Sequence, residues 1–173
     1  VRSSAASDVY KRQIQVVKSG DAKELVEIID NLPSENRLAL DDARNVRMAM
    51  SLFNAMSDAD QTEFKREHTA QYNKLVACDK IIKDMTAADA VTTAANKLPD
   101  PDSLTLRDKE TVYAAKAALD ALTADQKQYL TSETISVIDQ CYTWMLRTEK
   151  YHVQRLIEDL PDDCLLYTSP SPR

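Results

Sequence analysis

Glycine is almost missing from this chain, because Gly20 is the only one in 173 residues. A glycine-rich loop that wraps the phosphates of a nucleotide is therefore excluded. Long apolar runs are missing as well, and no stretch approaches the roughly 20 consecutive residues that a membrane-spanning helix needs. These two absences argue against the common nucleotide-binding motifs and against insertion into a membrane.

Histidine and clustered cysteine are equally scarce. The two histidines, His68 and His152, have no acidic partner at metal-ligand spacing, and we assign both to surface or boundary positions. Cys78, Cys141 and Cys164 form no CxxC motif and no cysteine–histidine cluster. Because no pair of nucleophile and base stands out either, the sequence predicts no enzyme activity, no catalytic residues, no metal ligands and no cofactor.

The two ends of the chain differ from the alanine-rich stretch between them. Permitted codons for residues 8–13 (GAT GTG TAT AAG AGA CAG) and for 164–169 (TGT CTC TTA TAC ACA TC) contain one DNA word in inverted orientation. This word resembles the mosaic end of transposase sequencing adapters. We therefore interpret 1–13 and 164–173 as translated adapter, 14–20 as a lead-in, and 14–163 as part of a longer reading frame. A natural low-complexity tail at each end stays open as the alternative.

Acidic residues outnumber basic ones, and the formal charge of the chain is −6. Without the four basic residues and the one acidic residue of the two end segments, the charge becomes −9. A surface of this sign repels a phosphate backbone and anionic lipid, so we expect no nucleic acid and no membrane as partner. Alanine, leucine, lysine, glutamate and aspartate dominate, which favours helices joined by short turns and predicts an all-α fold.

A repeated apolar pattern is the clearest positive signal. A heptad ending in Leu-Pro occurs three times, with apolar residues at i, i+3, i+4 and i+7, the spacing of one helix face. The copies are Leu25, Ile28, Ile29 and Leu32; Val91, Ala94, Ala95 and Leu98; and Val153, Leu156, Ile157 and Leu160. The pattern therefore predicts the same helix in three places.

Two further stripes follow each of the first two copies and predict two more helices in each. The second-helix stripe is Val46, Ala49, Phe53 and Met56, aligned with Val112, Ala115, Leu119 and Leu122, and Asp42 and Asp108 precede it as predicted N-caps. The third-helix stripe is Tyr72, Leu75, Cys78, Ile82 and Met85, aligned with Ile135, Ile138, Cys141, Met145 and Thr148. A short helical turn is expected between the second and third helices. Both cysteines share one inward repeat position and are predicted to be buried.

These stripes predict tandem three-helix bundles that form an elongated array. The first bundle is expected over 21–85, the second over 86–151, and the first helix of a third bundle over 152–163. Thr86 and Asp89 have the spacing of a capping box, which predicts a helix start at the first boundary. No such break marks the second boundary, where the third helix is expected to continue into the next unit.

Two local features invite a functional interpretation. The segment DPDSLTLRD at 100–108 alternates acidic residues like a calcium loop, but it lacks the central glycine and the distal glutamate. A turn with a helix cap is therefore the better interpretation. Trp144 lies one residue before the stripe residue Met145. Two roles stay open for it: packing at the joint to a neighbouring bundle, which we favour, and anchoring a ligand.

The segment LTLRDKETVYAAKAALDALTADQKQYL at 104–130, preceded by VTTAANKLP at 91–99, is similar to a known repeat pattern. It resembles the FIVAR-like three-helix modules of large secreted and cell-wall-attached proteins of Gram-positive bacteria. The likeness covers 21–163 and is strongest in the second copy. It implies an extracellular, wall-attached location and a role in spacing or adhesion, with no catalytic residues.

The favoured function is a structural spacer or stalk, with neighbouring repeat modules of the same chain as its partners. Two alternatives stay open. One is an adhesion module that binds a host protein or glycan, for which an exposed aromatic patch on one copy would be the sign. The other is a non-catalytic accessory region of a secreted carbohydrate-active enzyme.

Overall fold

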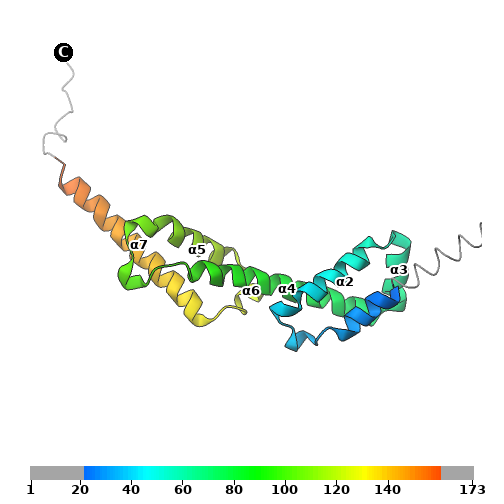
Figure 1. Cartoon of the computed structure of the whole chain (residues 1–173). Coiled ribbons are helices and arrows are strands. Elements are labelled where there is room, and N and C mark those ends of the chain that lie inside the picture. Colours follow the sequence, from blue (N-terminus) through cyan, green and yellow to red (C-terminus); the bar gives the residue numbers. More distant parts are fainter. Residues whose placement is uncertain (1–21, 161–173) are drawn as a thin grey trace, which may run out of the picture. The chain divides into compact units, whose positions relative to one another are not determined.

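A computed structural model describes residues 22–160, which form helices and turns with no strand among them (Figure 1). The predicted all-α class is therefore confirmed. The chain divides into two compact units between Thr86 and Ala87. The segments predicted as adapter, 1–13 and 164–173, and the lead-in 14–20 lie outside the described residues.

Unit 1 begins with a helix over residues 22–31. It continues with η1 (Glu35–Arg37), η2 (Leu40–Asp42), α2 (Ala43–Ala55), α3 (Asp58–Glu67) and α4 (Thr69–Ala95). The last turns of α4 open unit 2, and η3 (Pro101–Ser103), η4 (Leu106–Asp108), α5 (Lys109–Ala121), α6 (Ala124–Lys127) and α7 (Ser132–Glu158) follow. The helix over 22–31, α2 and α4 in unit 1 thus correspond in order to α4, α5 and α7 in unit 2.

The core of unit 1 consists of two apolar clusters built from the predicted stripes. One cluster joins Leu25, Ile29, Ala49, Phe53, Phe64 and Leu75. The other joins Leu32, Leu38, Ala43, Val46, Cys78 and Ile82. Each cluster therefore draws on the first helix, on α2 and on α4, and burial of these side chains stabilises the unit through the hydrophobic effect.

The core of unit 2 likewise consists of two apolar clusters, built from the aligned stripes. One cluster joins Val91, Ala95, Ala115, Leu119 and Ile138, and the other joins Leu104, Val112, Cys141 and Met145. Cys78 and Cys141 are free thiols that are completely buried, as predicted from their shared repeat position. Desolvation raises the pKa of both thiols, so each stays protonated at neutral pH.

The predicted helix start at Thr86 is wrong, because α4 runs from Thr69 to Ala95 without interruption. The Thr86 hydroxyl donates a hydrogen bond to the carbonyl of Ile82 at 2.6 Å, four residues earlier. This is the bond of a threonine inside a helix, whereas an N-cap needs a side chain that accepts from the following turn. At the second predicted boundary α7 does continue past residue 151, to Glu158.

The predicted caps at Asp42 and Asp108 are correct in position and wrong in mechanism. These residues immediately precede α2 and α5, but neither side chain bonds a helix N–H. Each carboxylate folds backward instead and accepts from a backbone N–H at 2.9 Å, that of Ala39 in unit 1 and that of Thr105 in unit 2. The reason is local: a 3₁₀ turn precedes each helix, and the aspartate closes that turn.

The segment between the second and third helices differs between the units. In unit 2 it is the short turn that the sequence predicts, α6, with four residues. In unit 1 it is α3, a helix of ten residues, so the prediction of a short turn is wrong there. Aligned positions differ by 66 at Ser57 and Thr123 but by 63 at Tyr72 and Ile135, so the extra three residues of unit 1 belong to this segment.

Candidate functional site

A set of interacting polar and aromatic side chains joins α5 to α7. We call it the α5–α7 network and define it as Lys109, Tyr113, Lys116, Tyr142 and Glu149. The Tyr113 hydroxyl donates to Glu149 Oε2 at 2.7 Å, and Lys109 Nζ lies 2.5 Å from Glu149 Oε1. The carboxylate of Glu149 on α7 therefore binds two side chains of α5, one at each oxygen.

Aromatic contacts extend this network along the same two helices. The rings of Tyr113 and Tyr142 meet edge to face, with centroids 5.4 Å apart and planes at 76°. Lys109 Nζ lies 5.7 Å from the centroid of the Tyr113 ring, and Lys116 Nζ lies 5.7 Å from that of Tyr142. Two lysines of α5 thus each lie over a tyrosine ring at the α5–α7 contact.

Lys116 also forms ion pairs with both helices. Its Nζ lies 2.9 Å from Asp120 Oδ1 on α5 and 3.0 Å from Asp139 Oδ1 on α7. Hydrogen bonds to Asp120 and then to Asp139 raise the pKa of Lys116, so the ammonium form is favoured. Lys116 therefore acts as a permanent positive link between α5 and α7.

The pKa shifts in the network point away from acid–base chemistry at neutral pH. The hydrogen bond to Glu149, with a smaller desolvation effect, raises the pKa of Tyr113 to about 12. Lys109, and next Tyr113, lower the pKa of Glu149. A general acid or base works best with a pKa near the working pH. The pKa of Tyr113 is raised and that of Glu149 is lowered, so both pKa values move away from neutral pH. What this arrangement does chemically is fasten α5 to α7.

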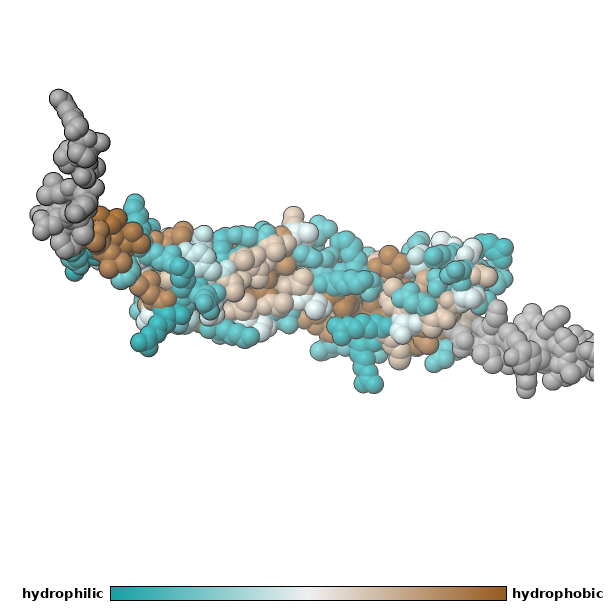
Figure 2. Space-filling view, turned by 90° about the horizontal axis from the view of Figure 1, so that it is seen from above, coloured by the Kyte–Doolittle hydropathy of each residue, from teal (hydrophilic) through white to brown (hydrophobic). Residues whose placement is uncertain are grey.

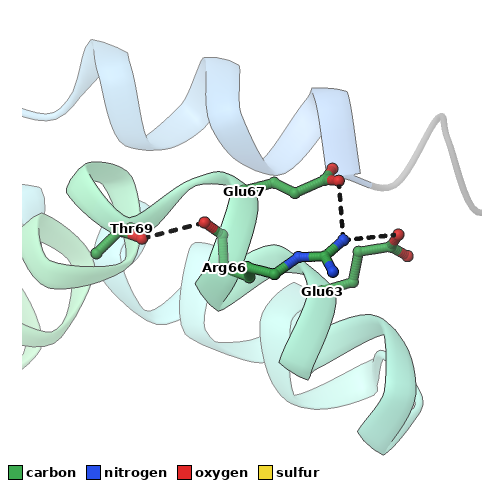
Figure 3. Close-up of polar contacts among 4 residues, drawn as sticks. All are labelled: Glu63, Arg66, Glu67 and Thr69. Atoms are coloured by element: carbon green, nitrogen blue, oxygen red, sulfur yellow. Dashed lines mark hydrogen bonds and ion pairs between the residues drawn. The ribbon is translucent and has the colours of Figure 1, made fainter.

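A second polar group lies where α3 ends and α4 begins (Figure 3). Arg66 reaches Glu67 at 3.3 Å and Glu63 at 3.7 Å, and all three side chains are more than half exposed. The Thr69 hydroxyl donates to the carbonyl of Lys65 at 2.8 Å and lies 3.3 Å from that of Arg66. It thus satisfies carbonyls that the end of α3 would otherwise leave unpaired. The group closes a helix end, and its ion pairs are open to solvent.

The residues considered from sequence lie apart from one another. His68 is half-buried between α3 and α4, with its ring 5.0 Å from that of Phe64, while His152 is exposed on α7. Trp144 is half-buried and packs against the cluster of unit 2 that contains Val112 and Met145. The indole thus belongs to the edge of the core of its own unit, a place that neither predicted role had given it.

The segment 100–108 forms turns with caps, as predicted. Asp100 Oδ1 accepts from the backbone N–H of Asp102 at 3.1 Å, and Asp108 Oδ2 accepts from both the N–H and the hydroxyl of Thr105. Among residues 22–160 no three side chains of histidine, cysteine, aspartate or glutamate come together in a way that could hold a metal ion. None of the helices in this part of the chain has the length and apolar character needed to cross a membrane.

Sequence reasoning missed the α5–α7 network. Its central pair, Tyr113 and Glu149, is separated by 36 residues, and no local spacing indicates such a contact. One signal was available: Lys116 and Asp120 have the i, i+4 spacing of a helical ion pair. That spacing marks an exposed helix face and says nothing about the neighbouring helix.

Comparison of the chain with protein-family models, curated proteins and solved structures finds no match. The likeness to FIVAR-like modules therefore stays a prediction from sequence.

Proposed function

We propose that the chain is a non-catalytic helical repeat segment that acts as a structural spacer in a large bacterial cell-surface or secreted protein. In this proposal each unit is a three-helix bundle. The segments α3 and α6 are the connections between its second and third helices. Further bundles of the same kind repeat in tandem, and the array holds a distal domain away from the cell.

Helix α4 is the observation that carries the proposal. It supplies Leu75 and Ile82 to the core of unit 1, and Val91 and Ala95 to the core of unit 2. No loop separates the two units along the chain, because the helix continues through Thr86 and Ala87. A continuous helix is a stiffer connection than a flexible linker, and stiffness is the property that a spacer needs.

The repetition of local details supports the same function. The backward bonds of Asp42 and Asp108 have the same length, and Ser57 and Thr123 cap α3 and α6 through the same kind of bond. The polar contacts of the α5–α7 network join two helices of unit 2, and pairs such as Lys80–Asp84 and Lys83–Asp79 lie within one helix. A repeat whose shared features are helix ends and cores is suited to a mechanical role.

Small-angle X-ray scattering of the full chain tests the proposal. A compact domain of 173 residues has a radius of gyration of about 16 Å. A spacer predicts a clearly larger value and the profile of an elongated particle. A radius close to that of a compact domain would contradict the proposal.

A matched variant separates the stiffness of α4 from any contribution of the chain ends. Insertion of Gly-Gly-Ser between Thr86 and Ala87 interrupts α4 and leaves both ends of the chain unchanged. We expect this variant to have a smaller radius of gyration and a broader distance distribution than the parent chain. If the two profiles coincide, the uninterrupted helix contributes no stiffness and the spacer proposal loses its main support.

A further inference from the structure

The end of α7 presents an apolar stripe to solvent. We call it the terminal stripe and define it as Val153, Leu156, Ile157 and Leu160. Their exposed fractions are 54%, 56%, 63% and 53%. Figure 2 shows this apolar surface gathered where α7 ends. The spacing i, i+3, i+4 and i+7 places all four residues on one face, and a contiguous apolar face of this kind is typical of an interaction surface.

The corresponding stripes of the two units are buried or half-buried: Ile28, Ala94 and Leu98 are half-buried, and the other residues are buried. Leu25, Ile29 and Leu32 are at most 4% exposed, and Val91 and Ala95 are at most 7% exposed. In unit 1 these residues pack against α2 and α4, and in unit 2 they pack against α5 and α7. The terminal stripe has the apolar pattern of a first helix. Among the described residues, however, no second and third helix pack against it.

Polar contacts in unit 1 indicate which side chains a helix that packs on the terminal stripe would carry. Lys74 Nζ on α4 donates to the carbonyl of Leu32 at 2.7 Å, and Gln71 Nε2 lies 3.4 Å from Asp30 Oδ1. A lysine at the carboxyl end of a helix is favourable because that end carries partial negative charge. The third helix of unit 1 therefore recognises both the apolar face and the negative end of the first helix.

The positions of Asp30 and Lys74 can be compared with the aligned positions in the other two copies. In unit 2, Asn96 stands at the place of Asp30 and Val137 at the place of Lys74. In the third copy the acid returns as Glu158, beside Leu160 at the end of the helix. In unit 1 the acidic helix end occurs together with Lys74, which donates to the backbone carbonyls of that end, and the terminal stripe again has an acidic helix end. We therefore expect a basic side chain on the helix that covers the stripe.

We propose that the terminal stripe is the docking surface for the second and third helices of a further repeat unit, a pair resembling α2 and the first half of α4 and carrying a lysine at the place of Lys74. This inference rests on the proposed spacer function, since it supplies the contact by which one unit adds to the next. The apolar stripe provides the core of that contact, and the negative end of α7 sets its register.

A chain extended with its own sequence tests the proposal. A copy of residues 33–85 is joined directly after Leu160, so that Leu160 precedes the copied Pro33 as Leu32 does in unit 1. The readout is backbone amide hydrogen exchange over residues 152–159. We expect exchange in this segment to become at least about tenfold slower than in the parent chain.

Two matched extensions serve as controls. An appended copy that carries Val46→Asp loses a buried contact of α2 and should leave exchange at 152–159 as fast as in the parent. An appended copy of residues 99–151, which has Val137 in place of the lysine, should slow exchange by a smaller factor. Equal protection by all three extensions would mean that tethering alone is responsible and would overturn the proposal.

Two further outcomes would also overturn it. One is unchanged exchange at 152–159 in the chain extended with the unsubstituted 33–85 copy. The other is concentration-dependent dimerisation of the parent chain in sedimentation, abolished by Ile157→Ser, which would make a second copy of the chain the occupant. Neither result depends on the scattering of the parent chain, so failure of the docking proposal and failure of the spacer proposal are distinguishable.

Discussion

The two units share most of their buried repeat positions, with identical residues at some of them and different side chains at others. At the end of unit 1 next to α3, the rings of Phe53 and Phe64 lie 5.8 Å apart, and those of Phe53 and Tyr72 lie 5.2 Å apart. The corresponding cluster of unit 2 contains aliphatic residues instead, with Leu119 buried and Leu130 and Ile135 packed against it. Corresponding stripe positions thus form a cluster with aromatic rings in unit 1 and an aliphatic cluster in unit 2.

The difference between aromatic and aliphatic side chains in these clusters accompanies the difference in length between α3 and α6. The longer α3 supplies Phe64, which is buried against Phe53, whereas the four residues of α6 supply no buried side chain. Larger rings need more covering surface, because close packing leaves no voids. The comparison therefore indicates that the connection between the second and third helices differs together with the side chains of the adjacent cluster.

Of the substitutions considered, removal of the Phe64 ring is expected to lower the free energy of unfolding most. If it had no effect, the ring that α3 contributes would not matter to the core of unit 1. Phe64→Ala should lower the free energy of unfolding of unit 1 by about 3–5 kcal/mol, since a buried ring is replaced by a cavity. Leu130→Ala in unit 2 should cost less, because Leu130 is only partly buried. Urea unfolding followed by far-UV circular dichroism measures both variants.

Trp144 makes it possible to assign the loss to one unit. It is the only tryptophan of the chain, and its ring packs against the core of unit 2. Its fluorescence therefore follows unit 2, while circular dichroism follows all helices. Equal losses for Phe64→Ala and Leu130→Ala would mean that the connection between the second and third helices is no more important to unit 1 than to unit 2.

The main helices could be predicted from sequence because their signal is local and repeated. The i, i+3, i+4 stripes placed Val46, Leu75, Val112 and Ile138 in the core, and all four are completely buried. The boundary at Thr86 was less predictable, whereas the continuation of α7 past residue 151 agrees with the prediction. Thr86 and Asp89 match a capping box, but buried residues lie on both sides of Thr86, with Ile82 before it and Ala88 after it, so the apolar pattern continues through the boundary.

Truncation of the valine that both cores share tests whether the two units are alike at this position. Val46 and Val112 occupy the same repeat position, and both are completely buried. Val112→Ala and Val46→Ala should each lower the free energy of unfolding by about 1–3 kcal/mol through lost burial and a small cavity. A loss near zero in either unit would show that its second-helix stripe does not face the core.

The polar contacts were harder to predict than the core. Tyr113 and Glu149 lie on different helices, and their pairing depends on the register of α5 against α7, which no single-helix pattern encodes. The place of Trp144 depends on the same register. Apolar stripes specify which face of a helix is buried, whereas a hydrogen bond between helices also needs the axial position of each partner.

The caps of the connecting helices test whether the two units share their local rules. Thr123 Oγ1 accepts from the N–H of Gln126 at 3.3 Å, and Ser57 Oγ accepts from the N–H of Asp60 at the same distance. Thr123→Ala and Ser57→Ala should each cost about 1 kcal/mol, the usual value for a lost N-cap. Chemical denaturation of the two variants gives both losses. Stabilisation by either alanine would indicate that the cap bond is not formed in solution.

The α5–α7 network gives the smallest expected effect and one that unit 1 lacks, because Arg47 and Thr86 stand where unit 2 has Tyr113 and Glu149. Lys109 and Tyr113 lower the pKa of Glu149 from its ordinary value of 4.5. Its contribution to stability is therefore present above pH 4.5 and is lost as the pH falls through the lower, folded-state pKa. Glu149→Gln should destabilise unit 2 at neutral pH, and the difference from the parent should shrink on acidification.

Tyr113→Phe provides the matching test at the other end of the pH scale. The folded-state pKa of about 12 exceeds the ordinary value of 10.0, so the contribution of the Tyr113 hydroxyl is present below pH 10 and is lost as the pH rises toward 12. The difference between parent and variant in the urea midpoint, measured by Trp144 fluorescence, should therefore narrow in alkaline solution and stay constant between pH 6 and about 9. A difference that stays constant up to pH 12 would mean that the hydroxyl stabilises unit 2 by packing alone, and the distinction between the two units would then lie in their cores and not in their charges.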